Sequence, residues 1–306
     1  MTTKAKKISL VDFPEEVDAE NGVRLYGETS YENQMAVLSH FLHNHRDEVG
    51  KEEQAEIIAA IREFLSRKEA RQPIDVEEWS DDQVWMAAED PGQYGLFSDF
   101  FNVPFPAPEN PKFTFIDLFA GIGGIRIAMQ NAGGNCVYSS EWNSQAQKTY
   151  LANYGEMPFG DITKESTKSY IPDGFDVLCA GFPCQPFSIS GKQKGFEDTR
   201  GTLFFDICSI ISKKRPQVVF LENVKNLVSH NNGDTFATIL DALKQEGYSV
   251  KYQVLNAMDY GDVPQNRERI YIVAFRDHYE FEAFSFPEKI KLKTKLNQII
   301  DFNGVR

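Results

Sequence analysis

The sequence of residues 113–306 predicts an α/β protein with a doubly wound, parallel sheet. Two observations carry this prediction: apolar strand-like segments alternate with amphipathic helical segments, and a glycine cluster follows the first strand segment. In such sheets ligands bind outside the carboxyl ends of the strands. The residues directly after each strand are therefore the candidate site residues.

The elements follow in order along the chain. FTFIDLFA is predicted as a buried strand, IRIAMQNAG as an amphipathic helix ended by glycine, CVYSSEW as a second strand and SQAQKTYLANYG as a second helix. Three more apolar strands are expected in FDVLCAG, QVVFLEN and RIYIVAF. The helices FDICSIISKK and DTFATILDALKQEG lie between them.

The N-terminal third differs in charge and pattern. Residues 1–110 hold 10 Lys and Arg against 23 Asp and Glu, a net charge of −13, whereas residues 111–306 hold 22 against 22, a net of zero. We expect an acidic helical extension over 1–71, with an apolar stripe from Ile57 to Leu65, and a Pro-rich connector over 72–112. The neutral remainder can still present a basic face to nucleic acid.

The cysteines and the hydropathy exclude several classes of protein. The four cysteines (Cys136, Cys179, Cys184 and Cys208) form no CxxC pair, so we expect reduced thiols and no metal site. No apolar run is long enough to cross a bilayer, and the start lacks a secretory signal. The sequence predicts a cytoplasmic protein with no membrane partner.

The first strand segment ends in a turn rich in glycine. Gly121, Gly123 and Gly124 follow Phe119, but Arg126 stands where a GxGxxG pattern would have its third glycine. Alone, this cluster fits either a nucleotide-like cofactor or a structural turn.

Three residues that follow later predicted elements also fit a cofactor site. Glu141 ends the second strand 20 residues beyond Gly121, where a carboxylate can bind the hydroxyls of a ribose. Trp142 offers a flat face for a purine. Asp161 could accept from an adenine amino group, or could simply cap a turn.

Residues of a second site lie at the ends of three other strands. Cys184 comes after FDVLCAG with Pro183 before it, and Glu222 ends the next strand, so a nucleophile and an acid are expected at one sheet edge. Arg267 and Arg269 lead into RIYIVAF. We expect them to point alternate ways, one toward the site and one toward the scaffold.

From about Phe113 to about Pro287 the chain resembles the cytosine-C5 DNA methyltransferases. The motifs FIDLFAGIGG, SEWN, GDIT, GFPCQPFSISGKQKGFEDTRGTLFFDI, ENVKN and NAMDYGDVPQNRERIY occur in the family's order. The resemblance implies a Rossmann-like methyltransferase sheet, S-adenosyl-L-methionine as methyl donor, double-stranded DNA as substrate and a restriction-modification context.

The resemblance also assigns roles to residues. Cys184 matches the nucleophile, Glu222 the acid at cytosine N3 and Arg269 an arginine near O2, with Arg267 beside it. The cofactor positions are Phe119, Gly121, Gly123, Gly124, Glu141, Trp142, Asp161, Ile162 and Pro183. A loop that closes over DNA would include Ser188, Ser190, Lys192 and Arg200.

These residue types suit methylation of C5. A thiolate that adds at C6 makes C5 enamine-like, and the base must first be flipped out of the duplex. Glu222 would hold or donate a proton at N3, and Arg269 would act electrostatically at O2.

The chain departs from the family near its end. Members continue into a target-recognition domain and a GNSV-like segment, neither of which is found before Arg306. We therefore expect either the catalytic subunit of a split enzyme, with a second polypeptide supplying recognition, or a truncated form. Alternatives are an RNA cytosine-C5 methyltransferase and a cofactor-binding subunit without activity of its own.

Overall fold

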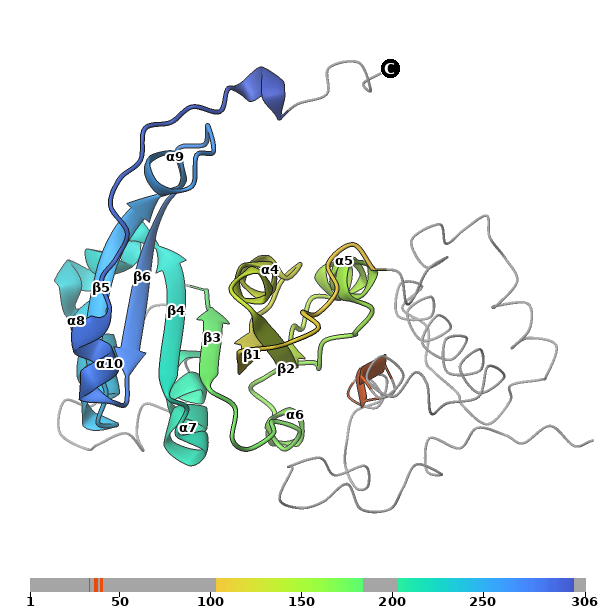
Figure 1. Cartoon of the computed structure of the whole chain (residues 1–306). Coiled ribbons are helices and arrows are strands. Elements are labelled where there is room, and N and C mark those ends of the chain that lie inside the picture. Colours follow the sequence, from red (N-terminus) through yellow and green to blue (C-terminus); the bar gives the residue numbers. More distant parts are fainter. Residues whose placement is uncertain (1–32, 34–35, 38, 41–102, 184–202, 300–306) are drawn as a thin grey trace, which may run out of the picture. The chain divides into compact units, whose positions relative to one another are not determined.

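A computed structural model of the chain describes residues 33, 36–37, 39–40, 103–183 and 203–299. The chain divides into two compact units, Met1–Phe175 and Asp176–Arg306 (Figure 1). The five described residues before position 41 are helical, as predicted for this part of the extension. The predicted apolar stripe from Ile57 to Leu65 lies outside the described residues, and the predicted domain boundaries stay predictions.

The first unit is built on two parallel strands. β1 (Phe113–Leu118) pairs with β2 (Gly134–Ser140), and the register shifts between Phe115 and Ile116. The connection between them is α4 (Gly124–Asn131), which packs on both strands. After β2 come α5 (Ser144–Tyr154) and the short α6 (Glu165–Lys168).

The helix α5 has clear sequence signals at both ends. The Asn143 side chain accepts from the backbone N–H groups of Gln145 and Ala146, so it caps the first turn. Gly155 ends the helix at φ 72°, a left-handed conformation that glycine adopts without strain. The predicted helix SQAQKTYLANYG is thus confirmed nearly to the residue.

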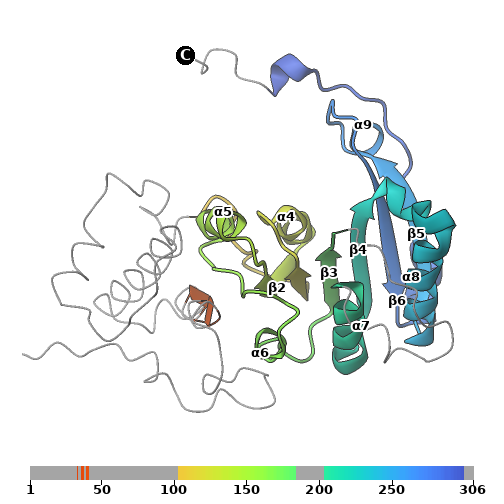
Figure 2. The same ribbon diagram turned by 180° about the vertical axis from the view of Figure 1, so that it is seen from behind.

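Within residues 176–183 and 203–299 of the second unit, four strands lie in the order β3-β4-β6-β5. Its elements, in chain order, are β3 (Val177–Gly181), α7 (Leu203–Lys214), β4 (Val218–Val224), η2 (Lys225–Val228), η3 (His230–Gly233), α8 (Asp234–Gln245), β5 (Ser249–Asn256), α9 (Ala257–Tyr260), β6 (Glu268–Phe275), α10 (His278–Ala283) and η4 (Leu296–Gln298). Helices α8 and α10 cover opposite faces of the β5–β6 edge (Figures 1 and 2).

The α/β class is confirmed, but the expectation of an all-parallel sheet is wrong. β3 and β4 run parallel, whereas β6 runs antiparallel to both β4 and β5. Only the short α9 and a turn join β5 to β6, and a connection of that length cannot make the crossover that parallel neighbours need. The sequence reading also overlooked β5 as a strand.

Buried aliphatic and aromatic side chains fill the core of each unit. Phe115, Ile116 and Tyr138 are fully buried in the first, and Ile207, Leu221 and Ile239 in the second. Cys136, Cys179 and Cys208 are buried thiols, as expected for reduced cysteines, and Cys184 lies outside the described residues. Among the helices that the structure describes, none is long and apolar enough to span a membrane.

Candidate functional site

The glycine turn after β1 adopts a backbone that requires glycine. Phe119 and Gly121 both have φ 57° and Gly123 has φ 91°, so three of five residues are left-handed. A methyl group at Gly123 would lie 2.1 Å from the ring of Tyr154, whereas one at Gly121 would meet nothing within 4 Å. Gly123 is therefore needed for packing, and Gly121 leaves space that a ligand can approach.

Glu141 ties this turn to the end of β2. Its Oε2 accepts from the backbone N–H of Gly121 at 2.9 Å, and its Oε1 accepts from that of Asn143 at 2.7 Å. Gln147 fixes the strand end by donating to the Glu141 carbonyl. Each carboxylate oxygen keeps a second lone pair, so Glu141 can still accept from two further hydroxyl groups.

Trp142 and Asp161 flank this carboxylate in different ways. The side chain of Trp142 is 72% exposed, which leaves an indole face open to a flat ligand. Asp161 closes a turn, because its Oδ1 accepts from the backbone N–H and the hydroxyl of Thr163 at 2.9 and 2.8 Å. Both bonds use Oδ1, and Oδ2 can accept from another donor.

The segment that carries Asp161 is attached to β2. Phe159 donates its N–H to Ser139 and accepts from the N–H of Glu141, both at 2.8 Å, and it forms a parallel bridge with Ser140. Ile162 is buried beside it. Glu141 and Asp161 therefore emerge from two backbone segments that are hydrogen-bonded to each other.

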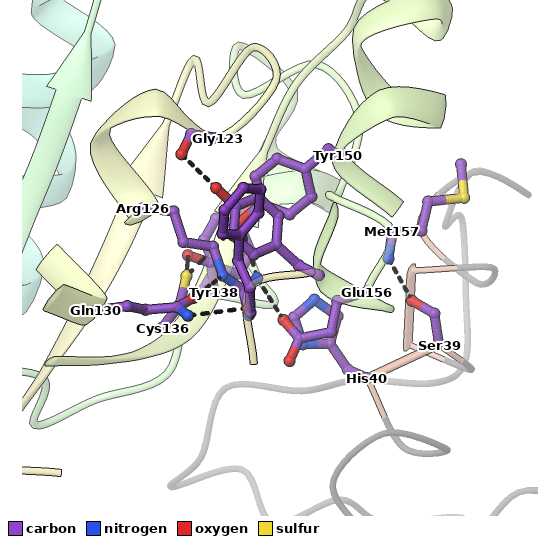
Figure 3. A network of polar contacts seen from close by, with 12 residues as sticks. Ser39, His40, Gly123, Arg126, Gln130, Cys136, Tyr138, Tyr150, Glu156 and Met157 are labelled. Atoms are coloured by element: carbon purple, nitrogen blue, oxygen red, sulfur yellow. Dashed lines mark hydrogen bonds and ion pairs between the residues drawn. The ribbon is translucent and has the colours of Figure 1, made fainter. Parts of the chain in front are cut away.

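Arg126, at the position of the missing third glycine, lies in a buried network (Figure 3). Its guanidinium pairs with Glu156 at 2.7 Å, donates to Gln130 and Tyr150, and lies 4.4 Å from the ring centroid of Tyr154. The charge of Glu156 raises the pKa of Arg126 against the opposing effect of burial. Arg126 is thus a structural residue behind the glycine turn.

Asp117, which the sequence reading did not single out, is fully buried near the end of β1. Neither carboxylate oxygen has a hydrogen bond of normal geometry to the described residues. Burial raises the pKa of Asp117 to about 7, while the charge and backbone N–H of Arg126 lower it and the charge of Glu141 raises it. Asp117 stands in the FIDLFAGIGG motif, but nothing in the local sequence shows that its carboxylate is fully buried.

The second unit brings Glu222 and both predicted arginines together. Glu222 Oε1 lies 2.9 Å from Nε of Arg269 and 4.0 Å from Nη2 of Arg267. The expectation that the arginines point alternate ways is wrong, because residues two apart in an extended chain lie on the same face. Their approach to one carboxylate makes a small, partly exposed charged cluster.

Glu222 also lies beside the strand that leads to Cys184. The β3–β4 register places Gly181 opposite Glu222. The buried Asn223 donates from Nδ2 to the carbonyl of Phe182 at 2.8 Å, which fixes the chain just before the exposed Pro183. Asn223 is a positioning residue that the sequence reading missed, although it sits next to the predicted acid.

The structure does not describe the remaining predicted site residues. The nucleophile Cys184 and the loop residues Ser188, Ser190, Lys192 and Arg200 lie outside the described residues. Within residues 103–183 and 203–299, and the five described residues before them, no cluster of His, Cys, Asp and Glu could hold a metal ion.

A glycine turn tied to a strand-end carboxylate, and an acid with two arginines on neighbouring strands, are features of an α/β cofactor-dependent enzyme. Residues 113–303 match the family described as C-5 cytosine-specific DNA methylase. The chain belongs to this family.

Curated relatives agree with this assignment. The type II methyltransferase M.HpaII of Haemophilus parainfluenzae is 55% identical over 223 residues, which cover 72% of this chain and 59% of the relative. M.HhaI of Haemophilus parahaemolyticus is 54% identical over 186 residues, which cover 61% of this chain and 56% of that relative. The chain thus spans somewhat more than half the length of these relatives.

Solved structures show a weaker likeness. The S. pombe Dnmt2 methyltransferase matches with a TM-score of 0.44 and 21% identity, over 58% of this chain and 57% of that one.

Proposed function

We propose that the protein transfers a methyl group from S-adenosyl-L-methionine to C5 of a flipped-out cytosine in double-stranded DNA, through a covalent bond between Cys184 and C6. The observation that carries the proposal is the contact of Glu222 with both Arg269 and Arg267, on a strand paired with the one that leads to Cys184. Membership of the methylase family supports the same reaction.

The residues of the first unit fit S-adenosylmethionine. Glu141 retains acceptor capacity for the two ribose hydroxyls, Trp142 offers an exposed face to the adenine, and Asp161 Oδ2 can accept from the adenine amino group. The space at Gly121 leaves room for the chain of the ligand. When bound, this cofactor supplies an electrophilic methyl group.

The second unit supplies the groups that activate cytosine. The Cys184 thiolate would add to C6, and electron density would move toward C5 and N3. Glu222 would hold a proton at N3, which offsets the charge of the adduct, and Arg269 would stabilise charge at O2. After methylation, a base removes the C5 proton and the thiolate leaves C6, so the aromatic ring is restored.

Arg269 and Arg267 have a second role in this proposal. Both arginines approach the Glu222 carboxylate and hold it in position before substrate binds. Entry of cytosine would redirect Arg269 toward O2 and release Glu222 to bind N3. The ion pair therefore keeps the acid in place until the base arrives.

Tritium transfer from labelled S-adenosylmethionine to duplex DNA tests the reaction in the protein that contains this chain. Cys184→Ser should abolish transfer and leave cofactor binding near normal, because a hydroxyl is a far weaker nucleophile. Cys208→Ala is the matched control: burial raises the pKa of Cys208 to about 12, so that thiol is unreactive near neutral pH. Retained transfer in Cys184→Ser would exclude the covalent mechanism.

Duplex DNA with 5-fluorocytosine at the methylated position tests the adduct directly. Fluorine cannot leave C5 as a proton does, so the reaction should stop with Cys184 bonded to C6. Mass spectrometry should then find DNA attached to the peptide that contains Cys184. Transfer to RNA in place of DNA would favour the RNA methyltransferase alternative, and cofactor binding without transfer the non-catalytic one.

The restriction-modification context, a second polypeptide for sequence recognition and a cytoplasmic location remain predictions from the sequence.

A further inference from the structure

We propose that Asn33, in the N-terminal extension, is a positioning residue for the segment that presents Asp161 to the cofactor. The segment runs from Glu156 to Thr163. The proposal deepens the proposed function and rests on it, since it assumes that Asp161 binds the adenine. It gives the acidic extension, which lies outside the resemblance to the methyltransferases, a role in cofactor binding.

The side chain of Asn33 joins two parts of the first unit. Its Oδ1 accepts from the backbone N–H of Gly160 at 3.0 Å, and its Nδ2 donates to Thr167 Oγ1 at 3.1 Å. Asn33 and Gly160 are both buried. A buried N–H that loses its acceptor is costly, so this bond fixes the Phe159–Gly160 peptide group, one residue before Asp161.

Further residues of the same helix contact the same segment. Ser39 is buried and accepts from the N–H of Met157 at 2.8 Å, and His40 lies 3.5 Å from the carboxylate of Glu156 (Figure 3). The His40 ring also packs on Phe159, with ring centroids 5.6 Å apart. The described residues at positions 33, 36, 39 and 40 are each helical, and Asn33, Ser39 and His40 all contact this segment.

The segment from Glu156 to Thr163 is also bonded to the end of β2, where the cofactor residue Glu141 lies. Phe159 is hydrogen-bonded to Ser139 and Glu141 of the β2 end, and its ring stacks on Tyr138 with centroids 4.7 Å apart. The segment is therefore held between β2 and the N-terminal helix. Of the helix contacts, the Asn33 bond to Gly160 is the one adjacent to Asp161.

This placement separates two effects of Asn33. The bond to Thr167 docks the helix, whereas the bond to Gly160 sets the direction in which the chain enters the Asp161 turn. Loss of the second bond should impair recognition of the adenine amino group more than that of the ribose, because the Glu141 carboxylate is held by the backbone N–H groups of Gly121 and Asn143.

Binding of two ligands to the full chain tests this separation. S-adenosylhomocysteine carries the 6-amino group that Asp161 would accept from, whereas S-inosylhomocysteine carries a carbonyl oxygen there. Asn33→Ala should weaken binding of the adenosyl ligand about tenfold and change binding of the inosyl ligand less than about twofold. Thr167→Val is the matched control, because it removes only the bond between Asn33 and Thr167. It should lower the melting temperature by an amount similar to that in Asn33→Ala, and it should keep the wild-type preference for the adenosyl ligand over the inosyl ligand.

Hydrogen exchange of the ligand-free chain provides a readout that does not depend on the cofactor. Asn33→Ala should speed exchange at Gly160 about tenfold or more, and Thr167→Val should not. The proposal is overturned if exchange is unchanged, or if it rises while the preference between the two ligands stays at the wild-type value. If the wild-type chain binds neither ligand, the proposed cofactor site itself is wrong, and this role of Asn33 falls with it.

Discussion

Glu222 on β4 and Arg269 on β6 form an ion pair of 2.9 Å that runs diagonally across the two strands. The register places Glu222 opposite Tyr271 and Arg269 opposite Val224, so the pair joins diagonal neighbours on one face. Its side chains are each 21% exposed, and a substrate base could reach them. The pair is thus a partly open site whose charges are balanced before a ligand enters.

Glu222→Gln should lower methyl transfer about 100- to 10,000-fold, because the amide cannot hold or donate the proton at N3. Binding of S-adenosylmethionine should stay within about twofold, since Glu222 is not among the residues proposed to bind the cofactor. Single-turnover tritium transfer and calorimetry measure the two quantities. Glu268→Gln, on the neighbouring strand β6, is the control, because its partner is the exposed Lys225. Equal losses in both variants would contradict a specific role for Glu222.

Glu141→Gln should weaken S-adenosylmethionine binding by about 1–3 kcal/mol. The amide keeps one acceptor oxygen for either Gly121 or Asn143 and places an N–H donor against the other, so the turn and the ribose both lose a partner. Calorimetry of the purified chain measures the change. Glu165→Gln, at an exposed acid of the same unit paired with Lys168, should leave the affinity unaltered. Wild-type affinity in Glu141→Gln would remove this carboxylate from the cofactor site.

Gly123→Ala should destabilise the protein more than Gly121→Ala. Both positions have positive φ, so each substitution costs about 1 kcal/mol in backbone strain. Only at Gly123 does the added methyl collide with the Tyr154 ring, which adds about 1–3 kcal/mol of overpacking. Urea unfolding measures the difference. Equal stabilities would mean that Tyr154 moves aside at no cost, against its bond to the Gly123 carbonyl.

The strand and helix pattern could be predicted because apolar runs and capping residues are local. Asn143 and Gly155 mark the two ends of α5, and both signals stand in the sequence. The direction of β6 could not be predicted from its own residues, since an apolar strand has the same composition in either direction. It follows from the short connection after β5, a strand that the sequence reading missed although Val250, Tyr252 and Val254 alternate with polar residues.

The site was predictable where a motif names the residue and less so where its role depends on packing. Glu141 and Glu222 stand at strand ends, so their positions follow from the topology. The bonds of Asn223 and Asn33 join residues 41 and 127 or more positions apart, and no local pattern encodes such a partner. Asp117 is another such case, because its burial is set by helices and strands that fold around it.

The last prediction concerns the titration of Asp117. Its pKa is about 7 in the folded chain, with burial as the main cause, against 3.8 as the ordinary value. Between these values the folded state binds a proton that the unfolded state has released. The contribution of Asp117 to stability is therefore highest below pH 4 and falls as pH rises toward 7. A difference of roughly 3 pH units corresponds to about 4 kcal/mol.

Asp117→Asn keeps the shape of the side chain and removes its titration. The variant should therefore lack the loss of stability that Asp117 causes as pH rises. We expect the free energy of unfolding of Asp117→Asn, relative to that of the wild type, to rise by roughly 2–3 kcal/mol between pH 5 and pH 8. Urea unfolding of both chains without cofactor, at half-unit steps of pH, measures the difference and cancels the titration of other groups. Parallel curves would show that Asp117 ionises in the folded chain at its ordinary pKa, with Arg126 offsetting the cost of burial in full.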